Sequence, residues 1–251
     1  MKRITLVEAL KRMFVDRHCL SCGEVISYDS EYPFCTDCSE GWYELLKMRC
    51  RRCGRAKDDC VCLPSKIGKI CGGTASWSMF YDSGAAEEAR AFFGRLKRKY
   101  NRCAIDMCTD MMKKNLVQVC RSRGIKYKDF VVTYAPRRQE NLYKYGFDQS
   151  RMLAKSLAKK LGIKMICTLV NVGETEQKGL SKDDRALNAA ESYEYIENSI
   201  GENKNIFLVD DIMTSGATLY ACAFHLYSAG ALNVVPVVFA KDNYKTKGVE
   251  K

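Results

Sequence analysis

Residues 205 to 218, Asn-Ile-Phe-Leu-Val-Asp-Asp-Ile-Met-Thr-Ser-Gly-Ala-Thr, decide the fold of this chain. The first part, Ile206–Val209, is short and apolar without polar alternation, which is typical of a strand buried on both faces of a parallel sheet. Asp210 and Asp211 follow this run directly. Open α/β sheets bind ligands at the carboxyl ends of their strands, so we expect both carboxylates at the ligand-binding edge.

A turn of small residues comes next, before a helical pattern: Thr214, Ser215, Gly216, Ala217 and Thr218. Backbone N–H groups at a helix start, together with the helix dipole, favour an anion. Carboxylates do not hold phosphate, but they accept hydrogen bonds from vicinal sugar hydroxyls. One ligand, a ribose 5-phosphate group, therefore suits both parts. The alternative is an ordinary strand, turn and helix with an acidic N-cap. The chain has neither the P-loop motif nor the dinucleotide motif G-x-G-x-x-G.

This order of strand, paired acids and small turn resembles the phosphoribosyl-diphosphate signature of the type I phosphoribosyltransferases. The resemblance implies that Asp210 and Asp211 bind the ribose 2- and 3-hydroxyls as the catalytic pair. It also implies that residues 214–218 wrap the 5-phosphate.

Eight of the fourteen cysteines lie in the first 62 residues, in two sets of four. The sets are Cys19, Cys22, Cys35 and Cys38, and Cys50, Cys53, Cys60 and Cys62. Paired C-x-x-C units present four thiolates in the tetrahedral geometry of a structural Zn²⁺ site, and Gly23 and Gly54 fit knuckle turns that need a permissive backbone. A disulfide framework is the alternative, but it requires an oxidising compartment. We expect one or two structural zinc ions, with ligand pairing between the sets left open.

Strand-like and helical segments alternate through the rest of the chain. Strands are predicted at 75–81, 131–135, 164–170, 206–209 and 233–240, helices around 89–96, 105–119 and 149–161, and a polar loop at 137–145. This alternation predicts an α/β fold, a type I phosphoribosyltransferase-like parallel sheet flanked by helices. We divide the chain into a small N-terminal zinc-ribbon module with four-cysteine sites, residues 1–70, and a phosphoribosyltransferase-like domain, residues 71–251.

Four further features narrow the resemblance to the ComF family, in which a zinc module precedes a phosphoribosyltransferase domain. They are an amphipathic start before Cys19, the run Leu-Lys-Arg-Lys-Tyr at 96–100, Gly-Phe-Asp-Gln-Ser at 146–150, and Thr175-Glu176-Gln177 with Leu180, Arg185 and Asn188.

The family layout implies roles for two loops. Residues 136–146 would form the diphosphate side of the site, with Arg137, Arg138 and Lys144 as contacts. Residues 173–188 would form a hood that closes on charged phosphates, with Arg185 as a contact. The chain departs from the family at Tyr145, where arginine is usual, so Lys144 is expected to replace that cation. Asp148 stands where asparagine is common.

The formal net charge of +11 is concentrated in residues 71–130, which hold twelve basic and six acidic side chains. The cations gather between Arg95 and Lys128, a pattern typical of a nucleic-acid surface or of a solvated helix face. No apolar run approaches the ~20 residues of a membrane span. Charged residues interrupt the N-terminal segment, which argues against a signal peptide, so we expect a cytoplasmic protein.

The leading interpretation is binding of phosphoribosyl diphosphate with Mg²⁺, with transfer of the phosphoribosyl group as diphosphate leaves. The ComF resemblance implies a role in DNA uptake during natural transformation, with partners in the competence machinery. The rival interpretation is a single-stranded-DNA-binding competence factor with a non-catalytic ligand pocket. A nucleotide-salvage enzyme fused to a zinc ribbon is a third. The sequence identifies no acceptor substrate.

Overall fold

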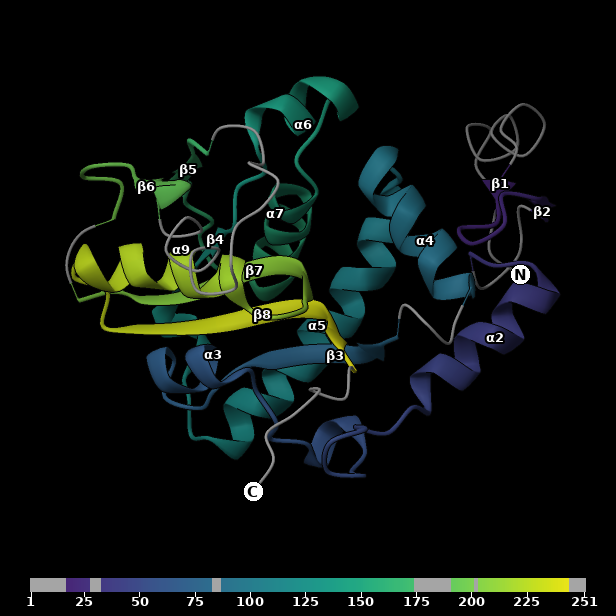
Figure 1. The fold of residues 1–251 in the computed structure, drawn as a ribbon, viewed down its shortest axis with the longest axis horizontal. Coiled ribbons are helices and arrows are strands. Elements are labelled where there is room, and N and C mark those ends of the chain that lie inside the picture. The colour runs from purple at the N-terminus through teal and green to yellow at the C-terminus, as the bar shows by residue number, and fades with distance from the viewer. Residues whose placement is uncertain (1–16, 28–32, 83–86, 174–190, 201–202, 244–251) are drawn as a thin grey trace, which may run out of the picture.

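A fully parallel four-stranded sheet forms the centre of the molecule, with the strand order β3-β8-β7-β4 (Figure 1). The computed structural model describes residues 17–27, 33–82, 87–173, 191–200 and 203–243. The strands are β3 (Ser76–Tyr81), β4 (Phe130–Tyr134), β7 (Asn205–Met213) and β8 (Asn233–Asp242). The predicted α/β class with a parallel sheet is confirmed.

Helices cover both faces of this sheet. One face carries α4 (Glu87–Arg98), α5 (Arg102–Ser122) and α7 (Gln149–Leu161), and the other carries α3 (Ser65–Ile70) and α9 (Ala217–Ser228). Strand β7 serves both cores, because Phe207 and Val209 belong to the first while Ile206 and Leu208 belong to the second. The apolar run is therefore buried on both faces, as its pattern predicts. No helix among the described residues combines the length and apolarity needed to cross a bilayer.

Two of the predicted elements are wrong. The segment 137–145, expected as a loop, contains helix α6 (Gln139–Tyr145), which buries no residue and so leaves no amphipathic pattern to detect. Within the predicted strand 164–170, Met165 makes only an isolated bridge to Val132. Strand β5 (Leu169–Asn171) instead pairs antiparallel with β6 (Tyr193–Tyr195) outside the main sheet.

Helix α7 has the predicted bounds because local signals define both of its ends. The Asp148 side chain caps its first turn by accepting a hydrogen bond from the Arg151 N–H. Gly162 ends it in the left-handed conformation, with φ of 64°.

The N-terminal residues form short elements around the cysteines. These are β1 (Arg17–His18), β2 (Val25–Ile26), α2 (Thr36–Leu46) and η1 (Lys57–Asp59); a second 3-10 helix, η2 (Tyr127–Asp129), precedes β4. Figure 1 shows α4 between the central sheet and the pair β1 and β2, with α2 below α4 near the end of β3. The Trp42 ring lies 5.0 Å from Phe92 and 6.3 Å from Phe239, between ring centroids. The first cysteine set therefore shares a core with the sheet, while the domain boundary at residue 70 remains a proposal.

Candidate functional site

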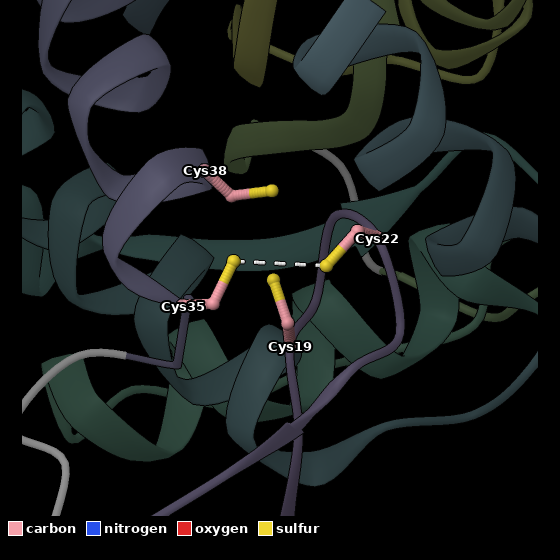
Figure 2. Close-up of side chains that lie close together, drawn as sticks. All are labelled: Cys19, Cys22, Cys35 and Cys38. Carbon is pink, nitrogen blue, oxygen red and sulfur yellow. Dashed lines mark hydrogen bonds between the residues drawn. The ribbon is translucent and has the colours of Figure 1, made fainter.

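Each cysteine set gathers into its own cluster. In both, the four sulfur atoms lie within 4.8 Å of one another. Figure 2 shows the sulfurs of the first set turned toward a common centre, with Cys19 and Cys22 on the knuckle and Cys35 and Cys38 at the start of α2. The pairing that the sequence left open therefore stays within each set.

The sulfur separations fit a tetrahedral metal ion. Cys22 and Cys35 are 3.7 Å apart in the first cluster, and Cys53 and Cys60 are 3.8 Å apart in the second, between Sγ atoms. A tetrahedron with Zn–S distances of about 2.3 Å has sulfurs about 3.8 Å apart. Cys60 has extended dihedral angles, and in extended backbone residues i and i+2 point the same way, which accounts for the Cys60-x-Cys62 spacing.

The two knuckles share one backbone design. The N–H of Gly23 donates to the Cys19 carbonyl at 3.1 Å, and the N–H of Gly54 donates to the Cys50 carbonyl at 2.7 Å. Both glycines have positive φ, 87° and 69°, so the predicted need for a permissive backbone is confirmed.

The knuckle backbone favours the thiolate, the form that binds metals, at the first cysteine of each cluster, whereas burial and neighbouring thiols raise the pKa of Cys38 and Cys60. Burial opposes ionisation of Cys19, but backbone N–H groups, led by that of Cys35, outweigh it and lower its pKa to about 6. In the second cluster the same balance lowers the pKa of Cys50 to about 7. The second cluster also has a buried cation, since the Lys241 ammonium lies 3.7 Å from the Cys60 sulfur.

The acid couplet, Asp210 and Asp211, lies inside β7 and not after its end. The strand continues to Met213 because Asp210 and Ile212 pair with Val238 and Ala240 of β8. The two carboxylates lie close enough together that the charge of Asp211 raises the pKa of Asp210. Asp210 is close enough to Cys222 of α9 to affect its titration, and Asp211 does the same to Cys108 of α5.

Asp210 is held at the start of α7. Its Oδ1 accepts the Ser150 hydroxyl at 2.8 Å and the Asp211 N–H at 2.9 Å. Protein encloses the carboxyl group although part of its surface stays accessible. That burial, followed by the charge of Asp211, raises the pKa of Asp210 to about 8, against the hydrogen bonds.

Asp211 faces α4. The Lys97 ammonium lies 3.6 Å from its Oδ2, with the aspartate side chain 15% exposed and the lysine side chain 47% exposed. From the sequence, Lys97 belongs to a basic run that is typical of either a nucleic-acid surface or a solvated helix face, and the structure brings it to the acid couplet.

The cradle, residues 214–218, connects β7 to α9. Thr214 and Ser215 are exposed, and Gly216 precedes the helix with φ of 78°. A Cβ atom at Gly216 would lie 2.6 Å from Cγ1 of Ile67 in α3, so glycine is required by backbone and by packing. Thr218 hydrogen-bonds Tyr193, whose pKa is raised by burial and by the nearby Cys222 and Asp210. The loop thus has the predicted N–H groups of a helix start.

The predicted diphosphate loop is partly engaged with the protein itself. The Arg137 guanidinium donates to the Lys97 carbonyl at 3.0 Å and lies 4.5 Å from the Tyr145 ring centroid. Arg138 is half-buried, and Lys144 is exposed with its ammonium 5.5 Å from the same ring. Arg185 and most of the predicted hood lie outside the described residues.

Three residues that contact this site were not assigned a role in it from the sequence: Ser150, Lys97 and Ile67. Ser150 had a usable signal, since it follows the N-cap Asp148 and so sits at the start of a helix. Lys97 and Ile67 had none, because each meets its partner only through tertiary packing.

Comparisons with known proteins return structures but no family. No protein-family model matches the chain, and no curated protein matches it. Similar solved structures include adenine phosphoribosyltransferase from Saccharomyces cerevisiae, in complex with adenine and an imino-altritol bisphosphate (16% identity, 56% of this chain and 70% of that chain, TM-score 0.36). Another is hypoxanthine phosphoribosyltransferase from Staphylococcus aureus (17%, 58% and 70%, TM-score 0.35). A hypothetical protein from Neisseria gonorrhoeae with bound ppGpp is a third (14%, 61% and 76%, TM-score 0.37). Similarities this low assign neither a family nor a ligand to the chain.

Proposed function

We propose that the protein binds phosphoribosyl diphosphate with Mg²⁺ at the carboxyl edge of β7, and that it transfers the phosphoribosyl group as a ComF-type protein of the DNA-uptake machinery. One observation carries the proposal. The acid couplet lies within the last four residues of β7, and the glycine turn that starts α9 follows three residues after Asp211. Hydroxyl acceptors and an anion cradle are thereby joined on one short segment, which supports a ribose 5-phosphate ligand.

The chain's own residues supply binding and orientation. Asp210 and Asp211 would accept the ribose hydroxyls, and the N–H groups of residues 214–218 would hold the 5-phosphate. Carboxylate oxygens also suit Mg²⁺, which when bound neutralises the departing diphosphate. Arg138 and Lys144 flank the diphosphate side.

Both cysteine clusters would hold Zn²⁺. Each has four protein ligands and no open position among them, which favours a structural role over a catalytic one. The metal ion would tie each knuckle to the rest of its cluster.

Calorimetric titration with phosphoribosyl diphosphate and Mg²⁺ tests the ligand. The double variant Asp210→Asn/Asp211→Asn should lose at least about 100-fold in affinity, since both carboxyl groups that would bind the sugar hydroxyls are removed. Asp129→Asn, an exposed acid ahead of β4 at the opposite edge of the sheet, is the matched control. Wild-type affinity in the double variant would remove the assignment.

A second candidate function, binding of single-stranded DNA, is favoured by a basic cavity of about 880 Å³ between the first knuckle and α4. None of the described residues that line it is acidic, and a Cβ atom at Gly94 would meet nothing within 4 Å. The cations lining it are Arg17, Arg90, Arg95, Arg98 and Lys99.

The predicted basic region extends along the whole of α5. Arg98 and Lys99 lie before α5, and Arg121 and Arg123 lie at its far end. A helix of 21 residues separates the two groups by roughly 30 Å. Arg95 is also engaged, because its guanidinium donates to the Ser21 and Cys22 carbonyls.

Salt-dependent binding of a labelled oligonucleotide distinguishes the two groups. Arg98→Gln/Lys99→Gln should reduce the slope of log affinity against log salt by roughly 1.4, at about 0.7 per lost phosphate contact. Arg121→Gln/Arg123→Gln should leave the slope unchanged. Equal effects of the two pairs would reject the cavity as the DNA site.

A further inference from the structure

Lys97 lies between the acid couplet and the loop 136–146, which is predicted to bind diphosphate. Its ammonium group lies 3.6 Å from Oδ2 of Asp211, while its backbone carbonyl accepts the Arg137 guanidinium at 3.0 Å. The residue therefore bridges the acid couplet and the loop 136–146. About half of its side chain is exposed, so the ammonium is accessible to a ligand in this region.

Arg137, the cation expected to contact diphosphate, is occupied by protein groups. Besides the Lys97 carbonyl, its Nη1 lies 3.4 Å from the Phe147 carbonyl, and the guanidinium covers the Tyr145 ring. Its backbone N–H donates to Asp148 at 2.8 Å. With these contacts Arg137 holds the Lys97 backbone and the loop in place. The accessible cation beside the acid couplet is the ammonium group of Lys97.

We propose that Lys97 is a substrate-binding residue whose ammonium group pairs with Asp211 in the free protein and binds the diphosphate of phosphoribosyl diphosphate in the complex. The inference rests on the proposed function and names a cation for it that lies outside the predicted loop. It also gives a role to Tyr145, where the chain lacks the usual arginine: the ring supports Arg137, and Lys97 supplies the charge.

The exchange of partners is energetically reasonable. The Lys97 side chain is half-exposed and the two charged groups lie 3.6 Å apart, so releasing Asp211 costs little. A lysine paired with phosphate oxygens forms charge-assisted hydrogen bonds, which are stronger than neutral ones. Asp211, once released, is available to the ribose hydroxyls.

Calorimetry with three ligands, each with Mg²⁺, tests this role: phosphoribosyl diphosphate, inorganic diphosphate and ribose 5-phosphate. Lys97→Gln should weaken binding of the two diphosphate ligands about tenfold or more and leave ribose 5-phosphate within about twofold of wild type. Lys97→Arg should retain most of the affinity. Lys159→Gln, at an exposed lysine of α7, is the matched control and should bind all three ligands as wild type does.

Two outcomes would overturn the inference while leaving the proposed function standing. One is wild-type affinity for phosphoribosyl diphosphate in Lys97→Gln. The other is an equal loss for all three ligands, which would mean that Lys97 acts only by positioning Asp211. Failure of the wild-type protein to bind any of the three would instead refute the proposed function, and the inference with it.

Discussion

The two cysteine clusters have the same ligands and similar knuckles, yet they join different parts of the hydrophobic core. Cys19 of the first cluster belongs to the core shared with α4, α5 and α7, whereas Cys50 and Cys60 of the second belong to the core shared with α3 and α9. The cysteine-bearing segment therefore contacts both cores.

The first cluster is connected to the acidic half of the proposed site. Arg95 donates to the knuckle carbonyls of Ser21 and Cys22, at 2.9 and 2.6 Å. Two residues later in the same helix, Lys97 meets Asp211. A displacement of this knuckle would therefore move α4 and alter the contact between Lys97 and Asp211.

The second cluster is connected to the phosphate half. Ile67, in the helix that follows Cys62, packs against Gly216 of the cradle. On the other side, Arg51 of the knuckle pairs with Asp82 after β3, and Asn243 accepts the Arg51 N–H at 2.9 Å. The N-terminal residues therefore support both halves of the proposed site: the first cluster supports the acid couplet, and the second supports the phosphate cradle.

The largest expected effect comes from disrupting the packing that joins the first cysteine cluster to the core. Trp42→Ala removes a 5% exposed ring from the aromatic group that joins α2 to Phe92 and Phe239. Unfolding in urea should show a loss of about 3–5 kcal/mol. Tyr43→Ala, at a neighbouring side chain that is 42% exposed, should cost less than about 1 kcal/mol. Equal losses would mean that the ring does not anchor the module.

On the second side, Ile67→Ala should cost about 2–5 kcal/mol, because Ile67 is fully buried. Gly216→Ala should destabilise by roughly 1–3 kcal/mol, since the new Cβ meets Ile67 at a positive φ. The double variant should be less destabilised than the sum by about 0.5 kcal/mol or more, because the smaller side chain relieves the clash. Strict additivity in a denaturant cycle would refute the contact.

Arg95→Met tests the connection between the first knuckle and the acid couplet. It removes hydrogen bonds from a charged group to two carbonyls, at a cost of about 1–3 kcal/mol that solvent exposure reduces. Thermal unfolding should report the loss, with Arg98→Met as a control on the same helix. A difference between the two variants of less than about 0.5 kcal/mol would count against the link.

A further prediction concerns the pH dependence of stability at Asp210. Its pKa of about 8 lies above the unfolded value, so the folded state holds an extra proton and stability falls as pH rises from about 4 to about 8. Asp210→Asn removes this dependence. Relative to wild type, its Tm should rise between about pH 5 and pH 8, by about 2–4 °C for each 1 kcal/mol. A constant Tm difference across that range, as expected for Asp129→Asn, would show that Asp210 is not held protonated.

Local signals made several elements predictable. Helix α7 has a side-chain cap and a terminal glycine, and β7 has an apolar run with both faces buried. Helix α6 was missed because no face of it is buried, and the end of β7 was missed because its pairing with β8 continues through two acidic residues. Pairing partners outweighed intrinsic strand propensity there.

The residue types and spacings of the chain alone determined the parallel α/β class, the two sets of metal-ligating cysteines, and the segment that carries the acid couplet and the cradle. These follow from hydrophobic period, ligand chemistry and turn chemistry, which act over a few neighbouring residues. Only the tertiary structure decided that Lys97 meets Asp211, that Ile67 lies against Gly216, and that the two cysteine clusters join different parts of the core. Those contacts join residues far apart in the chain, and they form only because the packed helices and strands bring them together.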